Sequence, residues 1–507
     1  MKKVYILLII FICHSNNLLA QFTNSNWCFG DSAGMHFDTT ITIFKCGTGF
    51  TSGSATISDI NGDLLFYGAT GNTTNTFTGL LRIGKLFNKL HTKVINGDTL
   101  VGGEWYHDML ILPKSIIDST FYVFVAGVVV PDTGLWYNIV DMKLQGGLGQ
   151  VVQKNVRYIN HPVQDMLTAV KHGNGKDWWL VTRRWSGLTP NDEFWVYLID
   201  SIGIHPLPVQ HEGLTHTDGA GDMSFNLTGD KLALCGWGNY LGIFDFDRCT
   251  GIISNEVLIE PNGALGSHPF KWYTSVVFSA DGSKLYVNSS QEAYNQSGKL
   301  YQFDLNSANI PASRILIDSF PVFASNSGME MGPDGKIYIS ALDYGGCNYP
   351  WPPGCYTTIN ANLSVINQPD SLGAACDFQL LNFSLGGYRA YWGLPNNPNY
   401  ELGAWVGSPC DTLTVGISEN TKNDVFFQAW YNNEWNMIHV NASKLKGSKG
   451  VLRLFDVQGR VLYEAKLNVI AGGYLTTEIN MNGIASGVYI VSLSTEKEKL
   501  QGKIMKY

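Results

Sequence analysis

Three stretches decide the fold of this chain: MSFNLTGDKLALCG at 223–236, VVFSADGSKLYVNS at 276–289 and MEMGPDGKIYISA at 329–341. Each contains an apolar strand, a turn carrying Asp, Asn or Gly, and a second apolar strand. The turn glycines Gly229, Gly282 and Gly335 follow one another at intervals of 53 residues. Such a regular recurrence of one supersecondary unit is typical of a repeat architecture.

Further copies of the unit extend this pattern in both directions. TAVKHGNGKDWWLVT at 168–182 places Gly175 54 residues before Gly229, and TISDINGDLLFYG lies at 56–68. The gap between these two leaves room for two units and has a weaker turn at Asp118. One more interval after Gly335 ends near the glycine pair at 386–387. The spacing therefore predicts seven units.

The repeated strands predict an all-β fold, a seven-bladed β-propeller over residues 21–400. Seven hairpins, most followed by another alternating strand, cannot each form a core alone. Arranged radially, they bury one another's faces and leave only short edges. The stretch 27–37 precedes the first repeat and shows no hairpin of its own. We expect it to complete the seventh blade and so to close the ring.

The N-terminus predicts export. Met1-Lys2-Lys3 is followed by an apolar run over 4–13 and a polar stretch that ends at Ala20, as in a signal peptide over residues 1–20. That run is too short to span a membrane, and no later segment is long enough. We therefore predict a secreted or cell-surface protein that reaches the exterior of the outer membrane through the periplasm and does not span the membrane.

Composition excludes one class of partner. The formal net charge is −8, and it becomes −10 without the two lysines of the leader. A mildly acidic chain with no basic cluster lacks the Lys and Arg residues that neutralise phosphates, so nucleic acid is not an expected partner.

The cysteines predict disulfides. Eight remain after the leader, and an even number in an exported chain favours disulfides over zinc, since no C-x-x-C pair exists. Sequence alone leaves 105 pairings open. Neighbours along the chain suggest the pairs Cys28 with Cys46, Cys235 with Cys249, Cys347 with Cys355, and Cys376 with Cys410.

The repeat pattern ends near LPNNPNY at 394–400. We predict a linker over 401–424 and a small β-sandwich over 425–507, in which VLRLFDVQGRVLYEA at 451–465 holds two half-buried strands. The tail resembles the type A-like C-terminal sorting domain of type IX secretion system substrates. The resemblance rests on LFD at 454–456, GRV at 459–461, ASGVYIV at 485–491 and KIMK at 503–506.

The resemblance of the tail implies that the type IX secretion machinery reads it, through a motif that includes Gly459, Gly487, Val488, Tyr489, Lys503 and Lys506. The alternative is an ordinary accessory sandwich. Residues 27–400 resemble the WD/YVTN-like propellers of surface proteins from the Gram-negative bacterial lineage that uses this secretion system, with matching stretches at 58–68, 134–155 and 167–181. That second resemblance implies a location rather than a reaction.

Catalytic and cofactor motifs are absent. The sequence has no G-x-S-x-G elbow, no P-loop and no G-x-G-x-x-G after a strand, so we predict no catalytic residue and no cofactor. HEGLTH at 211–216 has its histidines five apart, which favours an inter-blade loop over a metal site. In SDINGD at 58–63, Asn61-Gly62 favours a tight turn with positive φ at both residues over a calcium loop. We predict no metal.

Aromatic residues are the best candidates for ligand contact. Trp105, Tyr106 and His107 form one group, and Tyr349 and Trp351 lie in the proline-rich loop between Cys347 and Cys355. Aromatic faces beside polar groups hold sugars, and a rigid loop lowers the cost of ordering on binding. The alternatives are packing between blades for the tryptophans and shielding of a blade edge for the loop.

These observations favour a non-catalytic propeller that binds a glycan or a protein. An extracellular hydrolase or lyase acting on polysaccharide remains open, because paired carboxylates need not be close in sequence. A structural role in a surface assembly is the third hypothesis. The sequence does not decide between binding and catalysis.

Overall fold

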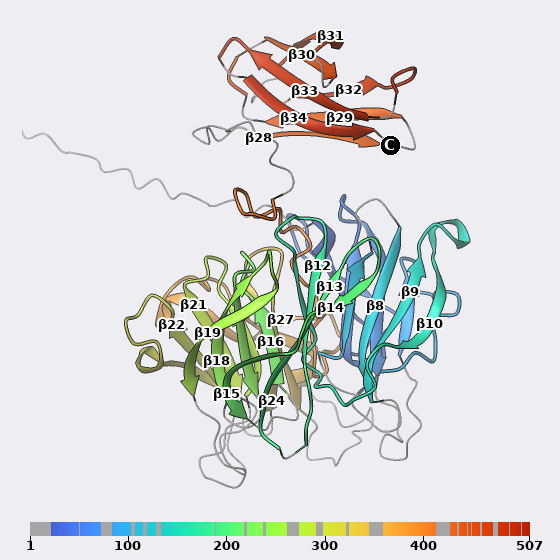
Figure 1. Ribbon diagram of the computed structural model, residues 1–507. Helices are drawn as coiled ribbons and strands as arrows, with labels where there is room; N and C mark the ends of the chain where they lie inside the picture. The colour runs from blue at the N-terminus through green and yellow to red at the C-terminus, as the bar shows by residue number, and fades with distance from the viewer. Residues whose placement is uncertain are drawn as a thin grey trace, which may run out of the picture. The chain divides into compact units, whose positions relative to one another are not determined.

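The computed structural model describes residues 22–506 except 50, 72–83, 103–106, 115–118, 128–132, 188, 217–220, 237–239, 261–272, 290–297, 321–323, 344–357, 412–425, 433–435, 444, 448, 457–458, 470–474, 486 and 498. The predicted signal peptide thus lies outside the described residues. The chain divides into two compact units, residues 1–415 and 416–507. Both consist of strands (Figure 1), and their described residues include no helix long and apolar enough to cross a membrane.

The first unit is built from antiparallel sheets that follow one another along the chain. The first three are formed by β1 (Asn26–Phe29), β2 (Ala33–His36) and β3 (Thr42–Lys45); by β4 (Thr51–Ser58), β5 (Leu64–Gly71) and β6 (Lys85–Asn88); and by β7 (Met109–Pro113), β8 (Thr120–Gly127), β9 (Gly134–Asp141) and β10 (Gln150–Arg157). Two short 3-10 helices, η1 (Phe22–Asn24) and η3 (Gln145–Gly147), lie in this part of the chain.

Four more sheets complete the unit. They are formed by β11 (Thr168–Lys171), β12 (Trp178–Arg183), β13 (Asn191–Ile199), β14 (Ile204–Pro206) and β15 (Gln210–His216); by β16 (Gly221–Phe225), β17 (Lys231–Gly236), β18 (Leu241–Asp247) and β19 (Ile252–Glu260); by β20 (Tyr273–Phe278), β21 (Lys284–Ser289), β22 (Lys299–Asp304) and β23 (Ile315–Ser319); and by β24 (Ala324–Met331), β25 (Ile337–Asp343), β26 (Asn362–Ile366) and β27 (Phe378–Ser384). The 3-10 helices η4 (Pro311–Ser313), η6 (Thr358–Ala361) and η7 (Gly373–Cys376) connect some of these strands.

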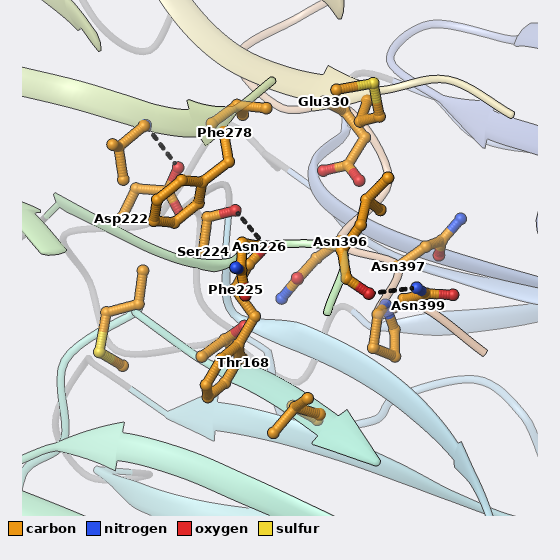
Figure 2. A pocket seen from close by; sticks show the side chains of 18 of the residues that line it. Thr168, Asp222, Ser224, Phe225, Asn226, Phe278, Glu330, Asn396, Asn397 and Asn399 are labelled. Carbon is orange, nitrogen blue, oxygen red and sulfur yellow. Dashed lines mark hydrogen bonds between the residues drawn. The ribbon is translucent and has the colours of Figure 1, made fainter. Parts of the chain in front are cut away.

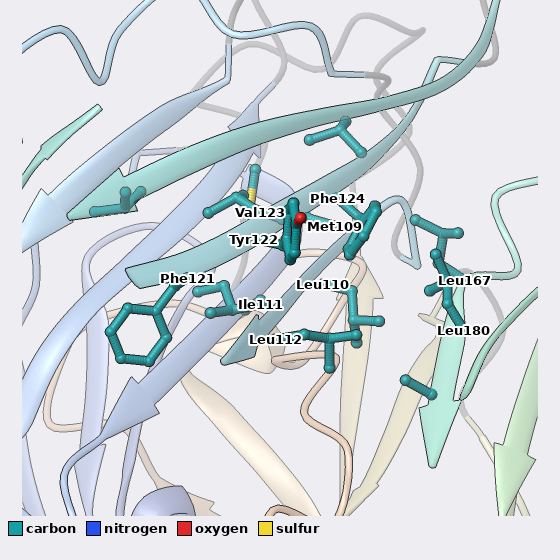
Figure 3. Packing of buried hydrophobic residues seen from close by; sticks show 14 of the residues in the cluster. Met109, Leu110, Ile111, Leu112, Phe121, Tyr122, Val123, Phe124, Leu167 and Leu180 are labelled. Carbon is teal, nitrogen blue, oxygen red and sulfur yellow. The ribbon is translucent and has the colours of Figure 1, made fainter. Parts of the chain in front are cut away.

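Buried side chains join each sheet to the next. The largest cluster joins the sheets that begin with β4, β7 and β11, and Figure 3 shows part of it around Met109, Phe124 and Leu180. Further clusters continue through the sheets of β16, β20 and β24. Another cluster joins the sheet of β24 to the sheet of β1. In it, Trp27 of β1 packs edge-on against Tyr338 of β25, so the final sheet lies against the first. The predicted all-β propeller fold is confirmed. We count sheets over the described residues only, so the number of blades stays a prediction.

We expected the N-terminal stretch, residues 27–37, to complete the last blade, but it does not. β1 and β2 form a hairpin of their own, and β3 extends it to a separate sheet. Asp31 and Ser32 form isolated bridges to Arg389, which follows β27, and the Asp31 backbone N–H donates there to the carbonyl of Arg389 at 2.8 Å. The glycine pair at 386–387 follows β27 and is not the turn of a repeat hairpin. Short strands such as NWCF and AGMH carry little periodicity, which explains the error.

The hairpins between the first two strands of several sheets share one turn. In each, a glycine with positive φ donates its N–H to the carbonyl three residues earlier, as Gly62 does to Asp59 and Gly229 does to Asn226. This is a three-residue hairpin loop with glycine in the left-handed region. Positive φ at Asn61 is therefore not needed, and among the residues of SDINGD only Gly62 has it.

Residues 394–411 follow the last sheet and cross the first strands of several sheets. We name them the axial segment. Asn396 donates from its backbone to Ser54 of β4 at 2.8 Å, and Tyr400 donates its hydroxyl proton to the carbonyl of Ile111 in β7 at 2.8 Å. The side chain of Asn399 reaches Leu227, directly after β16, at 3.1 Å. Because the first strands of neighbouring sheets contact one another, these bonds place the segment along the propeller axis.

The end of the axial segment is anchored by a disulfide and an arginine. Cys410 is bonded to Cys249, and the guanidinium of the buried Arg248 donates to the carbonyl of Gly403 at 2.6 Å. Residues 401–411, which we had assigned to the linker, are thus held to the propeller. Trp405 also donates its backbone N–H to Gly173 at 2.8 Å.

The observed disulfide corrects two predicted pairings. Cys249 and Cys410 are distant in sequence, and they meet because the axial segment brings Cys410 to the turn after β18. The suggested pairings of Cys235 with Cys249 and of Cys376 with Cys410 are therefore wrong. Nearness in sequence did not identify the cysteines that meet in the fold. Cys28, Cys46 and Cys376 are buried and form no disulfide, so the suggested pair of Cys28 with Cys46 is not formed in this structure. Cys235 is buried as well. Cys347 and Cys355 lie outside the described residues.

The second unit is a two-sheet β structure. One sheet contains β28 (Phe426–Asn432), β29 (Met437–Ser443) and β32 (Leu475–Asn480), and the other contains β31 (Val461–Asn468), β30 (Lys449–Asp456), β33 (Gly487–Thr495) and β34 (Lys499–Lys506), in that order. Leucine, isoleucine and valine side chains from both sheets form one core. This arrangement agrees with the small sandwich expected from the alternating pattern.

Candidate functional site

A cavity of about 70 Å³ lies on the propeller axis, between the axial segment and the first strands of four sheets. Figure 2 shows its walls: Thr168 begins β11, Asp222 lies in β16, Phe278 ends β20, and Glu330 lies in β24. The axial segment closes the remaining side with Asn396, Asn397 and Asn399. The cavity is therefore assembled from residues that are far apart in sequence.

Asp222 connects neighbouring sheets at one side of this cavity. Its Oδ2 accepts hydrogen bonds from the Ser275 hydroxyl at 2.7 Å and from the backbone N–H of Val276 at 2.9 Å. Its Oδ1 lies 3.5 Å from Nε2 of His107. Burial lowers the pKa of His107, while the charge of Asp222 opposes that shift. Asp222 therefore ties β16 to β20.

Two further carboxyl groups near Asp222 hold a proton more tightly than usual. Burial raises the pKa of Glu330 well above its usual range, and the negative charge of Asp222 raises it further. The same two causes act on Asp165, whose pKa is also raised, against hydrogen bonds from the backbone. Glu330 and Asp165 therefore keep a proton to higher pH than an exposed carboxyl group does.

Acceptor oxygens dominate the polar wall of the cavity. The amide nitrogen of Asn396 donates to the carbonyls of Met109 at 3.1 Å and Leu167 at 2.8 Å, which leaves Oδ1 of that amide as an acceptor. The hydroxyl of Thr168 and the carboxyl of Glu330 make no hydrogen bond to any described residue. Only 7% of Thr168 is exposed, so its hydroxyl depends on whatever fills the cavity.

The cavity is smaller than the pockets that enclose drug-sized ligands. Pockets that enclose small organic ligands measure about 300–1,000 Å³, whereas this one measures about 70 Å³. Met223, Phe225, Phe278 and Met331 contribute apolar wall between the polar groups. What fits is a few water molecules or a compact ion. Within the described part of the chain, no three His, Cys, Asp or Glu side chains lie together in a group that could hold a metal ion.

Of the residues predicted to contact a ligand, only one is described. His107 is 6% exposed and lines the axial cavity, where it faces Asp222. Trp105, Tyr106, Tyr349 and Trp351 lie outside the described residues, so their role stays a prediction. The sequence singled out His107 as a member of an aromatic group, whereas in the structure it lies in the cavity wall beside Asp222.

The two motifs that we considered as metal sites form a strand and a turn. Residues 210–216 form the strand β15 instead of the expected inter-blade loop, and His211 pairs there with Asp192 at 2.7 Å. His216, at the end of that strand, stacks on Tyr240 with ring centroids 3.8 Å apart. In SDINGD, Oδ1 of Asp59 accepts the backbone N–H groups of Asn61 and Asp63, which is a turn.

Several residues of the sorting motif stabilise the second unit. The ammonium of Lys506 donates to the carbonyls of Met481 and Ile484, both at 2.8 Å, and the hydroxyl of Tyr489 donates to the carbonyl of Ala485. Gly459 has φ near +82° in the turn between β30 and β31. Gly487 and Val488 begin β33, and Lys503 lies in β34.

Sequence reasoning missed Thr168, Glu330 and Asn396. All three lie in stretches that we quoted for their strands or turns, at 168–182, 329–341 and 394–400. The feature of the sequence that marked them was a polar side chain within or next to an apolar strand. That signal is weak, because a polar residue in a strand is usually on the solvent face.

Comparison with known families identifies the second unit. Residues 433–507 match the family model described as the secretion system C-terminal sorting domain. The predicted resemblance of the tail is confirmed. This domain marks proteins that are exported to the cell surface or secreted, so the protein is exported. No curated protein matches the chain.

Solved structures similar to the chain are propellers with low identity. The periplasmic gluconolactonase PpgL of Pseudomonas aeruginosa is 13% identical, with 73% of this chain and 98% of that chain covered and a TM-score of 0.42. A putative 6-phosphogluconolactonase of Bacteroides uniformis is 11% identical, with 67% and 92% covered and a TM-score of 0.41. PorZ, a surface component of the type-IX secretion system of Porphyromonas gingivalis, is 9% identical, with 94% and 68% covered and a TM-score of 0.27.

Proposed function

We propose that this protein is a surface or secreted propeller that binds a glycan or another protein without catalysing a reaction. The observation that supports the proposal is the occupied axis. The axial segment fills the centre of the first unit and leaves a cavity of about 70 Å³. Pockets that enclose drug-sized ligands have several times that volume.

Binding therefore falls to the outer surface of the propeller and its loops. Trp105, Tyr106, Tyr349 and Trp351 are the side chains that we propose to contact the ligand, because large aromatic faces stack on sugars and anchor protein interfaces. Delivery to the exterior follows from the sorting domain, whose partner is the type IX secretion machinery.

A polysaccharide hydrolase or lyase is the second candidate, and one observation favours it. The charge of Asp222 raises the pKa of both Glu330 and Asp165, and glycoside hydrolysis requires two carboxyl groups at one site. In this candidate, substrate would have to reach the cavity by displacing the axial segment.

The test uses the full-length exported protein and a panel of immobilised polysaccharides and glycoproteins. Retention on the support, new reducing ends and new unsaturated ends are recorded together. We expect retention of one ligand class with no new ends, and loss of retention in Trp351→Ala. Trp405→Ala removes a tryptophan that is 42% exposed on the axial segment, so it is the matched control. New ends that disappear in Glu330→Gln would overturn the non-catalytic function and support the enzyme.

A further inference from the structure

Two cysteine side chains lie together between the first two sheets of the propeller. Cys28 belongs to β1, and Cys46 directly follows β3. Cys28 is fully buried, 3% of Cys46 is exposed, and both pack in one cluster with Tyr67 of β5 and Phe87 of β6. The fold therefore encloses two thiols in one apolar cluster.

The hairpin of β1 and β2 explains why these two residues meet, although they are 18 positions apart. β1 ends one residue after Cys28, where Phe29 pairs with Ala33 of β2. β3 pairs with the other side of β2, and the backbone N–H of Cys46 continues that pairing to the carbonyl of Ser32 at 3.0 Å. Both cysteines therefore lie at the turn end of the first sheet.

The two sulfur atoms are in direct contact. Sγ of Cys46 lies 4.0 Å from the carbonyl oxygen of Phe29, the residue that follows Cys28. Burial raises the pKa of Cys46, but hydrogen bonds from the thiol of Cys28 and from Thr48 outweigh it and lower that pKa. Burial also raises the pKa of Cys28, and the bond to Cys46 raises it further. Cys28 is thus the donor and Cys46 the acceptor in a contact between two thiols.

The location of the protein favours oxidation of such a pair. The sorting domain marks the chain for export, and disulfides form and persist outside the reducing cytosol. The bond between Cys249 and Cys410 is one such disulfide. Zinc is the alternative for paired thiols, but it takes four ligands. Among the described residues, no third His, Cys, Asp or Glu side chain joins Cys28 and Cys46 in a group that could hold a metal ion.

From these observations we propose that Cys28 and Cys46 form a second disulfide of the first unit in the exported protein. The sulfur atoms already touch, so only a small approach brings them to the bonded distance of about 2.05 Å. The bond would tie the end of β3 to β1, where Trp27 packs on Tyr338 of the last sheet. It would therefore reinforce the sheet at which the first and last parts of the propeller meet.

The bond forms by thiol–disulfide exchange with a disulfide that a partner supplies, either an exported oxidoreductase or glutathione disulfide. The thiolate of Cys46 attacks one sulfur of that disulfide and releases the other as a thiolate, which gives a mixed disulfide. Cys28 then loses its proton and attacks Sγ of Cys46, which releases the remaining sulfur of the partner. Two protein thiols are oxidised, and the partner takes up both electrons and both protons.

Burial decides when this exchange can take place. Tyr67 and Phe87 pack on both cysteines in the finished fold. The exchange therefore takes place while the chain folds, and reductant does not reach the finished bond in the folded protein. Cys249 and Cys410 are only partly buried, so reductant reaches their bond first.

The test is disulfide mapping of the full-length exported protein, which is purified without reductant and denatured in iodoacetamide. Trypsin cleaves after Lys45, so Cys28 and Cys46 fall on separate peptides of the mature chain, 21–45 and 46–82, each with no other cysteine. We expect these peptides as one joined species with neither cysteine alkylated, and as two peptides after reduction. Alkylation of both cysteines, or a bond from either one to a different cysteine, would overturn the proposal.

Variants assign the effect on stability to this bond. They are compared in a Cys249→Ser, Cys410→Ser background, refolded with either reduced glutathione or glutathione disulfide. The entropy of closing a loop of about 18 residues predicts that the oxidised sample unfolds about 4 °C higher in calorimetry. Cys46→Ala should abolish that difference, whereas Cys376→Ala, which removes a buried thiol outside the pair, should leave it. An equal difference in Cys46→Ala, or none in the background, would contradict the proposal.

Discussion

Removal of the disulfide that anchors the axial segment should lower the stability of the first unit by a measurable amount. The perturbation is the double substitution Cys249→Ser and Cys410→Ser. The bond joins residues that are 161 apart in sequence. Closing a loop of that length in the unfolded chain removes entropy equivalent to about 5 kcal/mol at 25 °C, which sets the upper limit of the loss.

The expected change in melting temperature follows from the size of the unit. Unfolding entropy is about 2.1 cal/mol/K per residue, so the roughly 390 residues between 22 and 411 give about 0.8 kcal/mol/K. A loss of about 5 kcal/mol then lowers the transition of the first unit by about 6 °C. Because Cys249 and Cys410 both belong to that unit, the transition of the second unit should not move.

Differential scanning calorimetry of the full-length protein measures both transitions in one experiment. Reductant added to the folded wild-type protein and removed before heating should reproduce the shift of the double variant, and the same treatment of the double variant should change nothing. Cys376→Ser, which removes a buried thiol outside the disulfide, is the matched control for the loss of a cysteine. A shift below about 1 °C in the double variant would refute the loop-entropy reasoning.

Three further outcomes follow from single side chains. Asn396→Ala leaves the carbonyls of Met109 and Leu167 without this donor and should destabilise the first unit by about 2–4 kcal/mol, measured by denaturant unfolding. Partial burial of the carboxyl and the nearby charge of Asp281 raise the pKa of Asp370, so the wild-type protein loses stability as pH rises from the ordinary pKa through the raised one. Asp370→Asn should therefore be the more stable protein at neutral pH, with the difference vanishing in acid; equal stability at pH 7 would contradict this. Lys506→Met removes two hydrogen bonds from an ammonium and should lower the stability of the second unit by about 2–3 kcal/mol, whereas Lys497→Met on the surface should not.

Periodicity carried most of the fold information. The turn glycines Gly229, Gly282 and Gly335 recur because each opens a hairpin that needs positive φ at that position. The apolar strands on both sides follow from burial of both sheet faces between neighbours. The all-β fold and the position of the sorting domain were therefore accessible from local pattern alone.

The errors lie where local pattern is weak. β1 and β2 are four residues each and carry no turn glycine of the repeat type, so the sheet that they start was not recognised. The disulfide joins the turn after β18 to the end of the axial segment, and nothing near either cysteine in sequence specifies that contact. The stretch LPNNPNY has the composition of a linker, although its asparagines hold the propeller together.

The sequence by itself determined the secretion address, the strand-and-turn repeat and the β-rich tail, because each depends on residues that are neighbours along the chain. Only the tertiary structure decided which polar residues share the axis. Thr168, Asp222, Glu330 and Asn396 come from four distant stretches, and they meet because sheet packing converges the first strands on one line. Local periodicity contains no information about that convergence, since it arises from the closure of the ring.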